Sequence, residues 1–181
     1  MTATKQIVVL DIDDVLANFV DPFLEFISER HQFVLKREDI RRSFYEMGIS
    51  PDWMQEFVDL GNLRRLPVIP DSQECVSKLR EYFHLVAMTS REPGPDTTVW
   101  MREHFPRIVP IFTREKGGTC RDIGAFGLIE DQPQYAEQFS NSFLIAAPWN
   151  EGARCRFRGT WKEITEALLA QEQWRRFQSG V

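Results

Sequence analysis

The fold of this chain is decided by the stretch Ile7-Val8-Val9-Leu10-Asp11-Ile12-Asp13-Asp14. Its four leading residues are apolar and mostly β-branched, which predicts a buried strand, and three acids come where that strand ends. Ligands of open α/β sheets bind at this end of the strands. Asp11 and Asp13 would point to opposite faces of a continuing strand, so we expect a turn that brings them together. Because a bend with several carboxylates is unfavourable without a cation or substrate, the stretch indicates a divalent-metal site.

Two other interpretations of this stretch have to be weighed. An acid-rich strand end is often a solvated turn that holds no ligand. An EF-hand loop also opens with Asp-x-Asp, but it needs Gly at its sixth position and Glu at its twelfth. This chain has Leu16 and Pro22 there, so the calcium loop is excluded. The solvated turn stays open until the rest of the chain is considered.

The composition is that of an ordinary globular protein. The chain has 181 residues, 43% hydrophobic and 27% charged, enough for one core with at most a small insert. Its formal net charge of −5 argues against a dedicated nucleic-acid binder, and we see no basic stripe that could track a polynucleotide. No apolar run approaches the ~18 residues of a membrane span, so we expect no membrane association.

Cysteine usage and the N-terminus favour a cytoplasmic protein. Cys75, Cys120 and Cys155 are widely spaced and form neither a CxxC pair nor a disulfide framework, so we expect reduced thiols. Acids interrupt the N-terminal apolar run after four residues, so we expect no signal peptide. The oligomeric state is left open, with a homodimer as one option.

The residues after the acids predict a helical, aromatic segment. Three helices are expected: one beginning at Asp21-Pro22, one over 40–47, and one from Ser50-Pro51 to Gly61. The stretch 66–70 contains two prolines and looks like the return linker. An insert after the first strand lies above the carboxyl ends of the strands, where a lid belongs. We therefore assign residues 16–66 to a helical cap, and residues 1–15 and 67–181 to an α/β core.

From residue 71 onward, helices and strands alternate. Capping boxes are expected at Asp71-x-x-Glu74 and Thr160-x-x-Glu163, each leading a helix. The expected strands are 84–88, 107–112, 126–129 and 141–146, the last of these being the final strand. Pro110 places the strand 107–112 at an edge of the sheet. This alternation predicts a parallel sheet with helices on both faces, a Rossmann-like α/β fold.

Polar residues follow three of the expected strands. They are Asp11, Asp13 and Asp14, then Thr89 and Ser90, then Glu130 and Asp131, with Lys116 between the second and third groups. The carboxyl ends of parallel strands lie at one edge of a sheet, so these side chains should come together. Acids, hydroxyls, a lysine and acids again, in that order, favour an active site over a solvated turn.

The chain resembles a known superfamily in four segments, DIDDVLANF, AMTSR, FTREK and LIEDQP. They are similar to the motifs of the haloacid dehalogenase-like (HAD) phosphohydrolases, and more closely to those of the 5′(3′)-deoxyribonucleotidase family. The motifs span residues 7–133, and the later Pro148-Trp149-Asn150 is also similar. The resemblance implies a HAD-like fold with a helical cap. It also implies a Mg²⁺-dependent phosphomonoesterase that acts through an aspartyl-phosphate.

The resemblance further implies a role for each acid. Asp11 would be the nucleophile, while Asp13 would protonate the leaving alkoxide and later deprotonate the attacking water. Mg²⁺ would be held by Asp11, the backbone carbonyl of Asp13, and Asp131. Glu130 would orient a water molecule on the ion.

Charge neutralisation would fall to the second and third motifs. The resemblance implies that Thr89, with Ser90 as the adjacent candidate, hydrogen-bonds a transferring phosphoryl oxygen. Lys116 would neutralise charge that develops in the transition state. The chain departs from the family at Asp14, where Gly is common, and at Glu130, where the nearest relatives often have Asp. An extra acid at position 14 is expected to keep the turn but to perturb metal affinity.

Clues to the substrate come from the cap. Related nucleotidases stack a base between lid aromatics, and Phe19 and Phe44 are our candidates for reaching the pocket, although most aromatics here should form the core of the cap. Arg91 would contact phosphate or sugar, or else form a surface ion pair. We expect a small phosphorylated substrate, a nucleoside 5′- or 3′-monophosphate that is preferably deoxy.

Other readings of the chemistry stay open. The substrate could instead be a sugar phosphate or a nucleic-acid 3′-end, and phosphotransfer to an alcohol is not excluded. A non-catalytic HAD-like binding module is the alternative of a different class, although it should have lost Asp11 or Asp13. Dehalogenation is disfavoured because an acid at Asp13 suits a leaving group that needs a proton.

Overall fold

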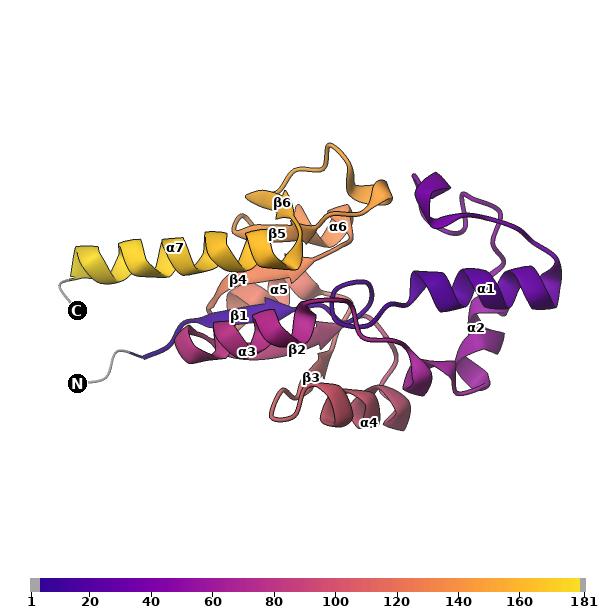
Figure 1. The fold of residues 1–181 in the computed structure, drawn as a ribbon, viewed down its shortest axis with the longest axis horizontal. Coiled ribbons are helices and arrows are strands. Elements are labelled where there is room, and N and C mark those ends of the chain that lie inside the picture. Colours follow the sequence, from indigo (N-terminus) through magenta and orange to yellow (C-terminus); the bar gives the residue numbers. More distant parts are fainter. Residues whose placement is uncertain (1–3, 180–181) are drawn as a thin grey trace.

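The centre of the computed structural model, which describes residues 4–179, is a six-stranded sheet (Figure 1). Its strands are β1 (Ile7–Leu10), β2 (His84–Thr89), β3 (Pro110–Phe112), β4 (Ala125–Glu130), β5 (Ser142–Ile145) and β6 (Phe157–Gly159). They pair in parallel in the order β3-β2-β1-β4-β5-β6. The predicted parallel α/β sheet is confirmed. Because β1 lies in the middle of this order, the acids that follow it lie between the ends of β2 and β4.

Helices cover both faces of the sheet. The helices of the described residues are α1 (Val20–His31), α2 (Pro51–Asp59), α3 (Ser72–Tyr82), α4 (Pro95–His104), α5 (Lys116–Asp122), α6 (Pro133–Ala136) and α7 (Trp161–Ser179), and α1 and α2 are not among those that cover the sheet (Figure 1). Figure 1 shows α3 and α7 side by side over one face. Val8 and Leu10 belong to the buried cluster that includes these two helices, whereas Val9 packs with Cys120 of α5 in a second cluster. Alternate residues of β1 thus bury opposite faces, as a strand covered on both sides requires.

The segment between β1 and α3 lies beyond the carboxyl ends of the strands (Figure 1). It contains α1, α2 and two short 3₁₀ turns, η1 (Arg37–Asp39) and η2 (Asn62–Arg65). Phe23, Ile27 and Phe57 are buried inside it. We refer to residues 16–66 as the helical segment.

The chain enters and leaves the helical segment at one place. The amide of Asn18 donates to the carbonyl of Pro67, and the amide of Ile69 donates to the carbonyl of Leu16, each at 2.8 Å. The outgoing and returning passages therefore lie side by side, joined as a short ladder. The helical segment is therefore joined to the rest of the chain at this ladder.

Two local predictions for the helical segment are wrong. Helix α1 begins at Val20, and Asp21 does not cap it, because its carboxylate instead accepts from Asn18 and Arg37. Residues 40–50 form bends and turns where a helix was predicted. Ile40 and Ile49 are each 2% exposed, so the apolar residues there do pack inward. So short a stretch does not sustain a helix by itself, and packing decides its path.

The outcome is mixed in the rest of the chain. The box at Thr160 forms, with Glu163 accepting from the backbone and hydroxyl of Thr160 at 2.8 Å. The box at Asp71 does not form, because this residue has a φ of 64° and its carboxylate pairs with Lys162 at 3.0 Å. Pro110 lies on the edge strand, as predicted. The strand β6 was missed because its three residues, two of them exposed, carry no apolar run.

The cysteines and helices of residues 4–179 add two observations. Cys75, Cys120 and Cys155 all have free thiols. No helix in this described part is long and apolar enough to cross a membrane.

Candidate active site

A cavity of about 640 Å³ lies between the carboxyl ends of the strands and the helical segment. Its sheet side carries most of the predicted polar residues, namely Asp11, Asp13, Asp14, Ser90, Arg91, Lys116 and Asp131. Its opposite side, from the helical segment, is largely apolar, with Phe19, Val20, Ile40, Phe44, Tyr45, Met54, Val58 and Leu63, and also includes the polar residues Arg42, Ser43 and Gln55. The cavity thus has a charged floor and an apolar roof.

Lys116 joins the first and last acidic motifs. Its Nζ lies 2.7 Å from Asp11 Oδ1 and 2.8 Å from Glu130 Oε2, and its side chain is only 1% exposed. Burial disfavours the ammonium, but the two carboxylates outweigh that effect and raise the pKa of Lys116 above its ordinary value. Tyr135 adds a ring face whose centroid lies 4.4 Å from Nζ. Lys116 is therefore a fixed, permanently charged group at the floor.

The acidic pair after β4 is split between two tasks. Glu130 Oε1 accepts from the backbone amides of Asp131 and Gln132, each at 3.1 Å, while Oε2 takes Lys116. Asp131 Oδ2 accepts from Gln132 Nε2 at 2.7 Å and from Trp149 Nε1 at 2.9 Å. Burial raises the pKa of Glu130 to about 7 and that of Asp131 to about 8. Both carboxyls are held rigidly in a site that disfavours their bare charge.

Three carboxylates converge in the described part of the chain. One oxygen each of Asp11, Glu130 and Asp131 lies within 4.8 Å of the others, and all three residues are buried. Burial, followed by the charge of Glu130, raises the pKa of Asp11 well above its usual range. A cluster of this kind is stabilised by a cation.

Arg91 pairs with Asp13 and does not project into the solvent. Its Nε donates to Asp13 Oδ2 at 2.9 Å and its Nη2 donates to Oδ1, a two-pronged pair. Its Nη1 also donates to the hydroxyl of Thr97 at 3.0 Å. The sequence left two interpretations open for Arg91, a phosphate or sugar contact and a surface ion pair. An ion pair is present, but it does not lie at the surface, because the Arg91 side chain is only 8% exposed.

The two hydroxyls of the second motif are placed differently. Thr89 is fully buried, and its Oγ1 accepts from the backbone amide of Arg91 at 3.2 Å. Ser90 lines the cavity, whereas Thr89 lies beneath the lining. Of these two residues, Ser90 is therefore the one on the cavity wall.

Asp14 has a partner that sequence reasoning did not find. It has a φ of 53°, a left-handed conformation that explains why Gly is common at this place. Its Oδ1 accepts from Arg37 Nη2 at 3.0 Å and from the amide of Val20 at 3.4 Å. Burial raises the pKa of Asp14 to about 7, against the opposing effect of Arg37. The negative charge of the extra acid is thus paired with Arg37 of the helical segment.

The two predicted cap aromatics both line the cavity. Phe19 is 9% exposed, and its ring centroid lies 5.4 Å from that of Phe23 and 5.6 Å from that of Phe57. Phe44 lies 5.3 Å from Phe23 and is only partly buried. Phe19 therefore serves mainly as core, while Phe44 offers more of its face to the cavity.

The sequence predicted no role for Trp149, which appeared only as part of a segment similar to the family, or for Arg37. Trp149, in the 3₁₀ turn η3 (Pro148–Asn150), follows β5, so a fourth strand end could have pointed to it. Arg37 gave no such signal, because it is one of several charged residues in an irregular stretch.

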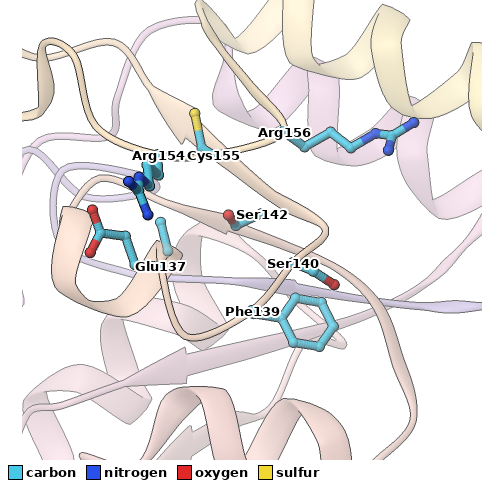
Figure 2. A pocket seen from close by; sticks show the side chains of 8 residues that line it. Glu137, Phe139, Ser140, Ser142, Arg154, Cys155 and Arg156 are labelled. Atoms are coloured by element: carbon cyan, nitrogen blue, oxygen red, sulfur yellow. The ribbon is translucent and has the colours of Figure 1, made fainter.

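A second cavity, of about 490 Å³, lies beside α6 and the loop before β6 (Figure 2). Its polar lining includes Glu137, Ser142, Arg154 and Arg156. Figure 2 shows Arg154 pointing towards Glu137 and Arg156 pointing away from the cavity. The two arginines therefore do not converge on one point. The first cavity, which is lined by most of the predicted acids and by Lys116, is the candidate active site.

Comparisons with known proteins identify the family of the chain. Residues 5–173 match the model of the family described as 5′ nucleotidase, deoxy (pyrimidine), cytosolic type C protein. The 5′(3′)-deoxyribonucleotidase of Bacillus subtilis strain 168 is 26% identical over 172 residues, covering 91% of this chain and 99% of that protein.

Solved structures share the fold at low identity. A haloacid dehalogenase-like protein of unknown function from Agrobacterium tumefaciens aligns with a TM-score of 0.69 at 8% identity, covering 93% of this chain and 99% of that one. A HAD family hydrolase from Deinococcus radiodurans, solved with bound phosphate and sodium, aligns with a TM-score of 0.56 at 14% identity, covering 93% and 96%. These structures share a HAD-like fold with the chain, and the family match over residues 5–173 shows that the chain belongs to the deoxyribonucleotidase-like 5′-nucleotidase family of phosphoric monoester hydrolases.

Proposed function

We propose that this protein is a Mg²⁺-dependent phosphomonoesterase that acts on nucleoside monophosphates, preferably deoxy, through an aspartyl-phosphate. One observation carries the proposal: Lys116 bridges Asp11 and Glu130 beside Asp131, at the floor of a cavity with an apolar roof. A fixed cation next to a carboxylate nucleophile is what an incoming phosphate dianion requires.

The residues present fit a magnesium ion. Glu130 is fully committed, with one oxygen on Lys116 and the other on two amides. Asp11 commits only Oδ1 and Asp131 only Oδ2 to donor nitrogens of the described residues. Asp11 and Asp131 would hold the ion with the backbone carbonyl of Asp13, and Glu130 would stand behind them. When bound, Mg²⁺ supplies charge neutralisation between the carboxylate and the phosphoryl oxygens.

The reaction then runs in two balanced steps on the chain's own residues. A carboxylate oxygen of Asp11 attacks phosphorus, the bond to the leaving oxygen breaks, and Asp13 gives its proton to the leaving alkoxide. A water molecule next attacks phosphorus, Asp13 takes its proton, and the bond to Asp11 breaks. Lys116 and Ser90 bind the phosphoryl oxygens, while Thr89 supports the loop from below.

The roof of the cavity supports a nucleotide substrate. Phe44, Met54 and Val58 face the charged floor across the cavity, so a ligand needs a phosphate at one end and an apolar, planar group at the other. The name of the Bacillus subtilis relative points to the same class. We further infer that residues 16–66 act as a cap that covers the bound nucleotide.

We also infer a cytoplasmic location. The thiols of Cys75, Cys120 and Cys155 are free, which suits a reducing compartment. Burial raises the pKa of Cys120 to about 11, so this thiol stays protonated and unreactive.

Phosphate release from a panel of substrates tests the proposal. The panel holds deoxy- and ribonucleoside monophosphates, sugar phosphates and an aryl phosphate, each assayed with Mg²⁺, with EDTA and with Asp11→Asn. Turnover of nucleotides that disappears in EDTA and in the variant supports the metal, the nucleophile and the substrate. Turnover of the aryl phosphate alone would reject the nucleotide assignment, and turnover that survives EDTA would reject the metal.

A further inference from the structure

One arginine of the helical segment contacts both that segment and the loop after β1. Arg37 lies on η1, and its Nη1 donates to Asp21 Oδ1 at 3.1 Å and to Asn18 Oδ1 at 3.3 Å, near the start of α1. Its Nη2 donates to Asp14 Oδ1 at 3.0 Å, in the loop that follows β1. One planar cation therefore ties the helical segment to the loop that carries the catalytic acids.

The same guanidinium lies over the ring of Trp149. Its central carbon is 5.0 Å from the centroid of the tryptophan ring. The Nε1 of Trp149 donates in turn to Asp131 Oδ2 at 2.9 Å. Stacking under a guanidinium fixes the plane of the ring, and the plane sets the direction of the ring N–H. A contact that begins at Arg37 thus reaches Asp131 through one side chain.

Asp14 gives the arginine a reason to stay in place. Its side chain is 4% exposed, and Arg37 is its one ion-pair partner among residues 4–179. A buried carboxylate that loses its partner is strongly destabilised. The pairing requires the helical segment to lie over the cavity, as it does here.

We propose that Arg37 is a positioning residue that holds the helical segment over the cavity and, through Trp149, orients Asp131 for its cation. Arg37 itself does not line the cavity, so it acts through its neighbours. The inference rests on the proposed function, since it takes Asp131 as a magnesium ligand. It predicts that cation affinity and closure of the segment depend on the same guanidinium.

Calorimetric titration of Mg²⁺ into the full-length, EDTA-stripped protein tests the link without any turnover. Arg37→Gln and Trp149→Phe should each weaken Mg²⁺ binding about tenfold, the low end for residues behind a metal ligand. The double variant should bind Mg²⁺ no more weakly than the weaker-binding single variant. The reason is that Arg37 and Trp149 act along one chain of contacts that ends at Asp131. Wild-type affinity in Arg37→Gln, or losses that multiply in the double variant, would overturn the inference.

Hydrogen exchange separates the two roles of Arg37. Arg37→Gln should speed amide exchange across α1 and α2, whereas Trp149→Phe keeps a ring under the guanidinium and should leave that exchange unchanged. Equal exchange in wild type and Arg37→Gln would rule out the closure role.

Two controls complete the design. Asp21→Asn removes a half-exposed ion-pair partner of Arg37 and keeps the contacts of Arg37 with Asp14 and Trp149. This variant should therefore bind Mg²⁺ like wild type. Thermal melting confirms that each variant is folded. If wild type bound no Mg²⁺, the proposed function would fail together with this inference. Normal binding in wild type with no change in Arg37→Gln would reject the inference alone.

Discussion

Arg91 grips both carboxylate oxygens of Asp13, so the proposed acid and base of the reaction is held by a cation that follows β2. The pair joins two motifs that are far apart in the sequence and adjacent in the sheet. Held from both oxygens, Asp13 has few orientations left, and one of these oxygens has to leave Arg91 to carry the proton that Asp13 gives to the leaving group.

Arg91→Ala should lower kcat/KM for a nucleoside monophosphate about 100-fold, since misplacing a proton donor has effects of this size. An aryl phosphate has a leaving group that needs little protonation, so its kcat/KM should fall much less. Arg64→Gln, which removes an exposed arginine 3.9 Å from Glu103, is the matched control and should behave like wild type. Equal losses on both substrates would show that Arg91 does not act through the proton of Asp13.

Removing the ammonium of Lys116 should destabilise the fold in a pH-dependent way. Lys116→Met leaves Asp11 and Glu130 buried without their cation, and breaking such a pair lowers the free energy of unfolding by about 3–5 kcal/mol. The two carboxyls can escape by taking up protons, so the loss should be large at pH 8 and smaller at pH 5. Urea unfolding at both pH values measures it.

A surface pair gives the matched control for this variant. Lys162→Met breaks an exposed pair with Asp71 that solvent screens, so its free energy of unfolding should stay close to that of wild type at both pH values. A loss for Lys116→Met that is the same at both pH values would mean that the orphaned carboxyls do not protonate.

The raised pKa values of Asp14, Glu130 and Asp131 predict how pH and magnesium act together. A carboxyl with a folded-state pKa of about 7 or 8, above its unfolded value near 4, stabilises the fold while it is protonated. That stability is lost as pH rises through 7 to 8. Without a divalent ion, the melting temperature should therefore fall by about 5 °C or more between pH 5.5 and pH 8.

Magnesium should reverse this loss. It replaces the protons on the acidic cluster, so the rise in melting temperature that it causes should be larger at pH 8 than at pH 5.5. Thermal melts with Mg²⁺ and with EDTA at both pH values measure the difference. An equal magnesium effect at both pH values would contradict the linkage.

Phe44 should contribute to substrate binding more than to chemistry. Phe44→Ala removes part of the apolar roof, so KM for a nucleoside monophosphate should rise about tenfold with little change in kcat. Leu60→Ala, which truncates a residue that is 56% exposed and lies outside the cavity, is the control. A fall in kcat with an unchanged KM would place Phe44 outside the binding surface.

The sequence predicted the floor of the site because sheet topology does most of the assembly. Residues such as Asp11, Ser90 and Asp131 follow parallel strands, and parallel strands end at one edge whatever their side chains. Lys116 follows the edge strand β3 and needs only a short turn to reach the same place.

The rest of the site could not be predicted because it depends on irregular packing. Arg37 reaches Asp14 across 23 residues of chain that include the irregular stretch 32–36, and no periodic pattern encodes that path. The strand β6 was missed for a similar reason, since a three-residue edge strand carries too little apolar signal. Local propensity fails where the contact that decides the structure is distant.

The paired passages at Leu16–Asn18 and Pro67–Ile69 make the helical segment a separable module in the history of the chain. Because both crossings lie within one hydrogen-bonded ladder, the segment can lengthen, shorten or be exchanged without rethreading a strand of the sheet. The floor that we propose as catalytic and the roof that we propose for substrate binding can therefore evolve at different rates. A lineage that keeps Asp11 and Lys116 is free to acquire a new specificity by changing only the segment between these two passages.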